Sequence, residues 1–252
     1  MIKDFYDKHK NFSYRTLTEY NISPGIKCKF DLLKANINIK KTYNHGIDLG
    51  CSGNSFLYFL DNIDQKFSLD IADLPLKQYT KKKRWYPICG DLLKLPYRND
   101  VFDFVSVLDV IEHLKEDKKA ISEISRILKK NGILIITVPH RQKYFTAQDR
   151  LIGHFRRYEI NQIIKIFNEF NLRNLKIFGV YGRLMAITNI QSTNPKKLEE
   201  NLLHLRNKYE SNLGFRKLWD LIVKFFSKLM KIDAKYNSIN KIRNIGLVFI
   251  KK

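Results

Sequence analysis

The sequence predicts an α/β fold in which helices cover both faces of a doubly wound, mostly parallel sheet. Three observations support this prediction. Strand and helix signals alternate from about residue 46 onward, a glycine-containing turn joins a strand to a helix within residues 46–60, and an unbroken apolar run fills residues 133–138. Such a run is typical of a strand buried on both faces, and the alternation is typical of parallel strands joined by crossover helices.

The composition of the 252 residues is that of a folded globular chain, with 44% hydrophobic and 28% charged residues. This balance excludes disorder over most of the length. Forty-six Lys and Arg against 25 Asp and Glu give a net charge of +21. Such a charge attracts nucleic acid, anionic membrane or a phosphorylated substrate, although lysines spread along a chain are also typical of AT-rich coding or heat adaptation.

The cysteines, the N-terminus and the hydropathy exclude several classes of protein. Cys28, Cys51 and Cys89 are odd in number and lack metal-ligand spacing, so neither a disulfide framework nor a metal site is predicted. The first ten residues are too charged for a signal peptide, and no apolar run approaches the ~18 residues of a spanning helix. We expect a cytoplasmic protein that could still touch a membrane surface.

The elements before the central helix are short. Residues 1–42 are typical of helices and turns, with a break at Ser23-Pro24-Gly25. A strand begins at 46–49, and a helix begins at 56–60 after the turn. Further strands are expected at 66–70, 85–89 and 102–108, the last of them rich in β-branched and aromatic residues.

The second half begins with a strongly periodic helix from Lys118 to Lys129, which Asn131-Gly132 should end in a left-handed cap. The buried strand 133–138 follows and stops at Pro139. Another amphipathic helix after Asn161, strands at 174–181 and 245–250, and about sixty intervening residues of helical pattern complete the chain. We therefore expect one domain over 1–252, with an N-terminal helical segment 1–42 and a helical insertion or lid at 184–240.

Acidic residues follow successive strands and outline a ligand site. The turn that begins at Asp48 does not match the dinucleotide pattern G-x-G-x-x-G, and its leading carboxylate favours a sulfonium or amino group over a phosphate. Asp70 lies 22 residues further on, where a carboxylate can accept both hydroxyls of a ribose. Asp91 could accept from an adenine amino group, and Asp109 ends the next strand at the ligand-binding edge.

The segments GIDLGCSGNSFLYFL, SLDIAD, GDLLKLPYRNDVFDFVSVLDVIEHL and ISRILKKNGILIITVP occur in this order over residues 46–139. In order and spacing they resemble the class I S-adenosylmethionine-dependent methyltransferases, most closely the branch with quinone-biosynthesis, glycan, lipid and small-metabolite enzymes. The resemblance implies a seven-stranded Rossmann-like sheet with an antiparallel final hairpin and S-adenosyl-L-methionine as cofactor. The cofactor-binding residues that it implies are Asp48, Gly50, Ser52, Gly53, Asp70, Ile71, Asp91, Leu92, Leu108 and Asp109. The chain departs from the family's three alternating glycines, since Ser52 and Asn54 stand at two of those places.

Two histidines are candidates for catalysis, and four further residues are candidates for substrate binding. His113 follows the fourth strand near the expected methyl group, where a side chain bonded to the backbone is an equal alternative. His154 lies in GHFRRY, which resembles a G-H-x-R-R-Y segment of this branch, and histidine can act as a general base near neutral pH. His140, Arg156, Arg157 and Tyr158 are the substrate candidates, unless they only tie this loop to the domain.

The clearest amphipathic helix lies at 217–231. Its apolar face comprises Leu218, Trp219, Leu221, Ile222, Phe225, Phe226, Leu229 and Met230, and lysines occupy mostly the other face. This pattern is typical of a lid packed over a cleft, and also of a helix that contacts an anionic membrane.

The function predicted is methyl transfer to a small-molecule, glycan or lipid-linked acceptor that carries negative charge. An RNA methyltransferase is the alternative that the net charge favours, although neither an RNA-binding module nor an Asn/Asp-Pro-Pro-aromatic sequence is present. A non-catalytic cofactor-binding scaffold is a third interpretation, permitted by the altered glycine turn, and a nicotinamide oxidoreductase a fourth.

Overall fold

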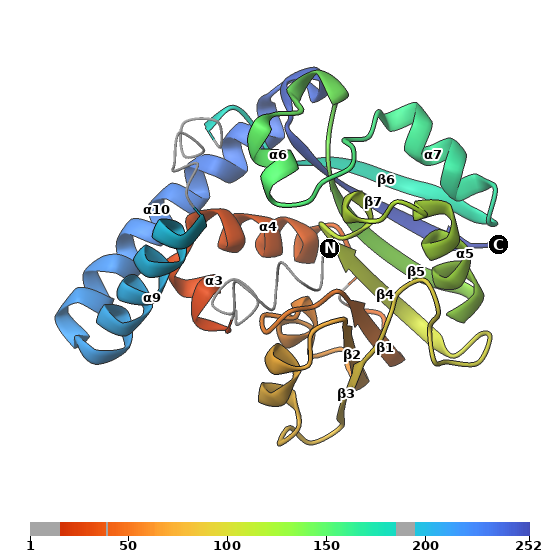
Figure 1. The fold of residues 1–252 in the computed structure, drawn as a ribbon, viewed down its shortest axis with the longest axis horizontal. Helices are drawn as coiled ribbons and strands as arrows, with labels where there is room; N and C mark the ends of the chain where they lie inside the picture. Colours follow the sequence, from red (N-terminus) through yellow and green to blue (C-terminus); the bar gives the residue numbers. More distant parts are fainter. Residues whose placement is uncertain (1–15, 39, 185–194) are drawn as a thin grey trace.

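The computed structural model describes residues 16–38, 40–184 and 195–252, with the side chains of 195–199 excepted. A seven-stranded sheet forms its centre, in the order β3-β2-β1-β4-β5-β7-β6 (Figure 1). Strands β1 to β5 pair in parallel, and β7 runs antiparallel to both β5 and β6. The strands are β1 (Tyr43–Leu49), β2 (Ile63–Asp70), β3 (Trp85–Cys89), β4 (Phe102–Leu108), β5 (Leu128–Pro139), β6 (Leu172–Tyr181) and β7 (Asn244–Lys251). The predicted fold class is confirmed, including the antiparallel hairpin at the end.

Helices cover both faces of the sheet. The α-helices are α3 (Thr18–Ile22), α4 (Pro24–Ala35), α5 (Asp117–Ile127), α6 (Ala147–Leu151), α7 (Ile160–Asn168), α9 (Pro195–Ser211) and α10 (Leu213–Tyr236). The apolar stripes of α5 and α7 pack into one core cluster, whereas α4 packs into the other. Strand β5 serves both clusters, since Leu134 and Ile136 belong to the first and Ile135 to the second. This alternation is the period of two that a strand buried on both faces requires.

The N-terminal segment is broken at the expected place. Helix α3 ends at Ile22, Ser23 has an extended backbone, and α4 begins at Pro24. The hydroxyl of Ser23 accepts a hydrogen bond from the backbone N–H of Ile26, and proline is favoured at the first helical position because it needs no N–H partner there. Residues 1–15 and 39 of the predicted segment 1–42 lie outside the described residues.

The junction after the central helix differs from the prediction. Helix α5 ends at Ile127, and β5 begins at Leu128 instead of Ile133. Leu128 is fully buried and pairs with Phe102 of β4, so sheet pairing outweighs continuation of the helix. Asn131 does adopt the expected left-handed backbone, with φ 60°, but inside the strand and not as a helix cap. The helix expected at 56–60 is likewise only a 3-10 turn, η1 (Phe56–Phe59).

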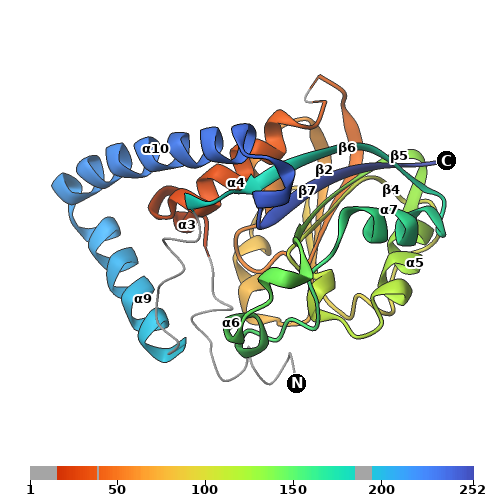
Figure 2. The ribbon, with the colours of Figure 1, turned by 90° about the horizontal axis from the view of Figure 1, so that it is seen from above.

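The predicted helix 217–231 forms the middle of α10, which with α9 projects beside the sheet (Figures 1 and 2). Helix α10 packs against α4 and β6 through Val223, Ser227, Met230 and Ala234, and most of the predicted apolar face is exposed. The packed face could not be recognised by hydrophobicity, because it uses small residues where backbones approach closely. A Cβ added at Gly179 of β6 would lie 2.5 Å from the carbonyl oxygen of Ala234. Residues 185–194 of the predicted insertion lie outside the described residues.

Candidate active site

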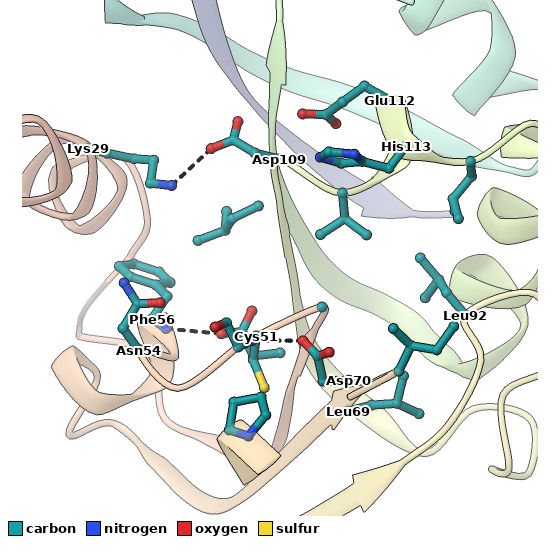
Figure 3. Close-up of a pocket in the computed structure, with 18 of the residues that line it drawn as sticks. Lys29, Cys51, Asn54, Phe56, Leu69, Asp70, Leu92, Asp109, Glu112 and His113 are labelled. Carbon is teal, nitrogen blue, oxygen red and sulfur yellow. Dashed lines mark hydrogen bonds and ion pairs between the residues drawn. The ribbon is translucent and has the colours of Figure 1, made fainter. Parts of the chain in front are cut away.

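A cavity of about 450 Å³ opens at the carboxyl edge of β1, β2 and β4, where the strand order reverses (Figure 3). Ligands of open α/β sheets bind at this position. Nine of the ten predicted cofactor residues line the cavity, namely Asp48, Gly50, Ser52, Asp70, Ile71, Asp91, Leu92, Leu108 and Asp109. Gly53 does not line it. Both predicted catalytic histidines, His113 and His154, do.

The turn after β1 is held in a left-handed conformation at two positions. Gly50 has φ 70°, and a Cβ there would lie 2.5 Å from Val110, so a side chain is excluded. Ser52 has φ 47° and keeps the backbone that the family's glycine would adopt. The phenol of Tyr79 donates to the carbonyl of Ser52 and accepts from the N–H of Ser55. These bonds fix the turn despite its substituted glycines.

Asp48 is buried and holds the turn to the sheet. Its carboxylate accepts hydrogen bonds from the hydroxyls of Ser55 and Ser106, both at 2.6 Å, and from the backbone N–H of Phe56 at 3.0 Å. Burial raises the pKa of Asp48, and these three donors oppose that shift. The carboxylate that was expected to face a cation is therefore already bonded within the turn, although it also borders the cavity.

Asp70 and Asp91 mark the ends of the next two strands. Asp70 accepts from the backbone N–H of Ser52 at 2.8 Å and from that of Ala72 at 3.0 Å. Burial raises its pKa, and backbone donors lower it. Asp91 is exposed and accepts from the N–H of Leu93. Each carboxylate oxygen has two lone pairs, so both side chains can accept further hydrogen bonds from a ligand.

Asp109 directly follows β4 and forms an ion pair that crosses the cavity to the N-terminal segment. The ammonium of Lys29 on α4 lies 2.9 Å from its carboxylate, as Figure 3 shows. Thr137 and Asn244 also donate to it, at 2.9 and 2.7 Å. Burial would raise the pKa of Asp109, but the charge and hydrogen bond of Lys29, with the other two donors, lower it to about 2. Asp109 is therefore ionised at neutral pH.

Glu112, His113 and His154 meet at the end of the cavity away from Asp70 (Figure 3). Glu112 is fully buried, and neither carboxylate oxygen has a hydrogen-bond partner within the described part of the chain. Burial, and then the charge of Asp109, raises the pKa of Glu112 well above its usual range, so the group is neutral. Nε2 of His154 lies 3.9 Å from Oε1 of Glu112, and the two imidazole rings are 4.5 Å apart.

The orientation of His154 is fixed by a hydrogen bond at its Nδ1. Its Nδ1 lies 3.0 Å from Oδ1 of Asp149, and because an ionised carboxylate only accepts, Nδ1 carries the proton. Arg157 donates three hydrogen bonds to the same carboxylate. Burial would raise the pKa of Asp149, but hydrogen bonds from His154, the backbone of Thr146 and Arg157 hold it well below its usual range. Nε2 is therefore left as the basic atom of His154.

One group of described residues could hold a cation. Glu112, His113 and His154 each offer a ligand atom within 4.8 Å of the others. Glutamate and histidine are common ligands of divalent metals, and a carboxylate such as Asp149 behind a histidine is typical of such sites.

None of the four predicted substrate residues lines the cavity. His140 is buried and bonds through Nδ1 to the carbonyl of Tyr158. The phenol of Tyr158 donates to Asp117, and Arg156 forms an ion pair with the same carboxylate. Arg157 binds Asp149. The structure thus gives these side chains partners within the protein, which is the alternative that the sequence left open.

Several lining residues escaped the sequence analysis. Lys29 and Phe30 come from α4, Tyr181 from the end of β6 and Asn244 from the start of β7. No local pattern connects these positions to the acids at 48–109, because only the folded sheet brings them together. Glu112 did carry a signal, since it lies between Asp109 and His113.

The comparisons with known proteins agree with this geometry. Residues 47–136 match a family described as a methyltransferase domain. An uncharacterized protein of Methanocaldococcus jannaschii is 31% identical over 183 residues, which are 71% of this chain and 74% of that protein. A Mycolicibacterium smegmatis protein named as an S-adenosylmethionine-dependent methyltransferase is 31% identical over 72 residues, 29% of this chain and 28% of that protein.

Two solved structures share the fold. An S-adenosylmethionine-dependent methyltransferase of Thermotoga maritima has a TM-score of 0.66 at 14% identity, with all of both chains covered. The N-methyltransferase NodS of Bradyrhizobium japonicum, in complex with S-adenosyl-l-homocysteine, has a TM-score of 0.53 at 17% identity, over 68% of this chain and 91% of that chain.

The cavity lining fits S-adenosylmethionine, a cationic ligand. Four aspartates face the cavity, whereas Lys29 is the only lysine among the described lining residues and is paired with Asp109. A side chain at Gly50 would clash with Val110, another residue of the cavity lining. This chain is a member of the class I S-adenosylmethionine-dependent methyltransferases.

Proposed function

We propose that the enzyme methylates a hydroxyl or amino group of a small or lipid-linked acceptor, and that His154 removes the acceptor's proton. The observation that carries this proposal is the alignment of Arg157, Asp149 and His154, which aims Nε2 at the end of the cavity beside Glu112. A histidine whose other nitrogen is bonded to a carboxylate is a typical general base, because the carboxylate stabilises the imidazolium that forms.

We propose the residues that hold the cofactor from their positions along the cavity. Asp70 would accept the ribose hydroxyls, while Asp91, Ile71 and Leu92 would border the adenine. The turn at Gly50 to Ser52, with Leu108 and Asp109, would border the methionine part, and the ionised Asp109 suits its ammonium. The support for this assignment is the placement of acids along one cavity, with Asp70 far from Glu112.

The cofactor supplies an electrophilic methyl group on a sulfonium. The protein's contribution is to orient the acceptor, to exclude water and to take up one proton at Nε2 of His154. Alignment in a closed site can supply ~7–11 kcal/mol of the barrier reduction. Glu112, held neutral, can donate a hydrogen bond to the acceptor or accept one from it. A negative charge on the acceptor would remain outside the cavity, which four aspartates line.

The test follows transfer of labelled methyl from S-adenosylmethionine to separated lipid, small-molecule and RNA fractions of a cell extract. His154→Ala should lower turnover about 10²–10⁴-fold, because a positioned base contributes this much. Asp149→Asn should lower it too, and cofactor affinity should stay unchanged in both. His45→Ala, which alters a histidine outside the cavity lining, is the matched control.

Two outcomes would contradict the role of His154. Unchanged turnover in His154→Ala would show that the acceptor is already ionised. Loss of wild-type turnover with EDTA, with recovery on addition of Mg²⁺ or Zn²⁺, would assign Glu112, His113 and His154 to a metal ion instead.

RNA methylation is the second candidate, and the net charge of +21 favours it. Against it, the cavity offers little attraction to phosphates, because Lys29, the only lysine among its described lining residues, is already paired with Asp109. Label that enters only the RNA fraction, with binding that weakens steeply as salt is added, would support this candidate over the first.

A further inference from the structure

The outward face of α10 carries a continuous apolar row. It comprises Leu218, Leu221, Phe225, Leu229, Ile232 and Tyr236, which we call the α10 stripe. Their exposed fractions are 58%, 64%, 59%, 37%, 46% and 74%. Spacings of three and four residues keep the stripe on one side of the helix, opposite the face that packs on α4 and β6. It extends over about 27 Å at ~1.5 Å per residue.

A row of lysines borders the stripe along one edge. Lys217, Lys224, Lys228 and Lys235 each precede a stripe residue, and all four are exposed. Within the described part of the chain, none of the four forms an ion pair with a carboxylate. Lys231, by contrast, is turned inward and pairs with Asp31 of α4 at 2.8 Å. The helix therefore has one anchored face and one amphipathic outer face.

We propose that the α10 stripe docks on an anionic lipid bilayer, with its apolar side chains in the interfacial region and the four lysines at the headgroups. A large apolar face flanked by lysines is typical of helices that lie in the plane of a membrane. No described helix is long and apolar enough to cross a membrane, so the contact is peripheral.

Charge distinguishes a bilayer from the other occupants of an apolar face. A second copy of this chain would bring another +21 charge and another lysine row, with no row of acids on α10 to meet it. Nucleic acid would match the lysines but not the leucines and phenylalanines between them. An anionic bilayer matches both sets of side chains at once.

The stripe lies close to the active site without being part of it. Helix α10 packs on α4, and α4 contributes Ile26, Lys29 and Phe30 to the cavity lining (Figure 2). Docking would thus place the cavity one helix away from the membrane, which suits a lipid-linked acceptor. The docking inference does not depend on the proposed base, because binding is measured without turnover.

The experiment is flotation of the full chain with phosphatidylcholine vesicles that do or do not contain phosphatidylserine. Binding is expected only to the phosphatidylserine vesicles. The variant Lys217→Gln/Lys224→Gln/Lys228→Gln should bind roughly a hundredfold more weakly, since each lysine near an anionic surface contributes about fivefold. The control Lys81→Gln/Lys83→Gln/Lys119→Gln removes the same charge from exposed sites elsewhere and should bind like wild type.

A second variant tests the apolar contact. Leu221→Ser/Phe225→Ser should bind at least tenfold more weakly, because both side chains would otherwise be buried in the interface. Leu175→Ser, at an exposed leucine of β6, is the control. Calorimetry with S-adenosylmethionine should give wild-type affinity for every variant, which shows that the fold is intact.

Three results would overturn the inference. These are absence of binding to the phosphatidylserine vesicles, equal binding to both kinds of vesicle, and equal losses in the stripe variants and their controls. A wild-type dimer in light scattering that becomes monomeric in Leu221→Ser/Phe225→Ser would assign the face to a second copy.

Discussion

Two groups of carboxylates along the cavity differ in how they are hydrogen-bonded. Asp48 accepts three hydrogen bonds, Asp70 two, and Asp109 accepts an ion pair and two further bonds. Glu112 is fully buried, yet neither of its oxygens has a hydrogen-bond partner among the described residues.

This difference separates the three preorganised aspartates from the reactive Glu112. Carboxylates that are already bonded keep their position, so they suit a ligand that is the same in every turnover. An unpartnered buried carboxyl group costs free energy in the empty enzyme, and that cost is relieved only when something binds. Such cost is typical of functional sites, where stability is given up for chemistry.

The largest effect on stability is expected when Asp109 loses the lysine with which it is paired. Lys29→Met should lower the free energy of unfolding by up to about 3–5 kcal/mol, because Asp109, whose side chain is only 27% exposed, would lose its counter-charge. The measurement is urea denaturation at neutral pH. Lys118→Met is the matched control, because its pair with Glu169 is as short, at 2.7 Å, but exposed, so about 1 kcal/mol or less is expected.

The same ion pair predicts an acid dependence. The pKa of Asp109 is lowered to about 2 in the folded protein, so its contribution to stability is complete above the usual pKa of an aspartate and is lost as pH falls toward 2. Lys29→Met should flatten this part of the stability profile. A wild-type slope in the variant would show that Lys29 is not what keeps Asp109 ionised.

An intermediate effect on stability, opposite in sign, is expected when Glu112 is replaced. Glu112 has a raised pKa when folded, so the unfolded chain releases its proton first and wild-type stability falls as pH rises above the usual range of glutamate. Glu112→Gln stays neutral and should be more stable, by about 1.4 kcal/mol for each pH unit through this range. The exposed Glu116→Gln is the control. Lower stability of Glu112→Gln at pH 7 would show that Glu112 is ionised and partnered.

The smallest effect is expected on the cofactor. Asp70→Ala should weaken binding of S-adenosylmethionine by about tenfold or more, because charge-assisted hydrogen bonds to two hydroxyls contribute ~1.5–3 kcal/mol each and some relaxation offsets their loss. Calorimetry measures the affinity, and Asp64→Ala, an exposed aspartate on the same strand, should bind like wild type. Equal affinity in Asp70→Ala and Asp64→Ala would exclude Asp70 from the cofactor site.

Patterns local in the sequence predicted the sheet and the acidic edge. The strands at 85–89 and 102–108 have the predicted bounds, because runs of β-branched and aromatic residues between turn residues have few alternatives. Asp48, Asp70, Asp91 and Asp109 follow parallel strands, and parallel strands bring their carboxyl ends to one edge. That these four line one cavity therefore followed from their order alone.

Local patterns failed where a side chain's role depends on its neighbours. An arginine such as Arg157 can bind an anionic substrate or an acidic side chain of the protein equally well. Only the fold shows that it binds Asp149. The apolar row of α10 was recognised, but not which face of the helix packs, because the packed face relies on Ser227, Ala234 and the close approach at Gly179.

The sequence by itself determined the order of the elements, the class of fold and the kind of ligand, because periodicity and acids at strand ends are local properties. Only the tertiary structure decided which charges have partners. Lys29 reaches Asp109 across 80 residues, and the described segments around Glu112 give its carboxyl group no hydrogen-bond partner. The free energy of a buried charge depends on what surrounds it in space, and the order of residues along the chain does not contain that information.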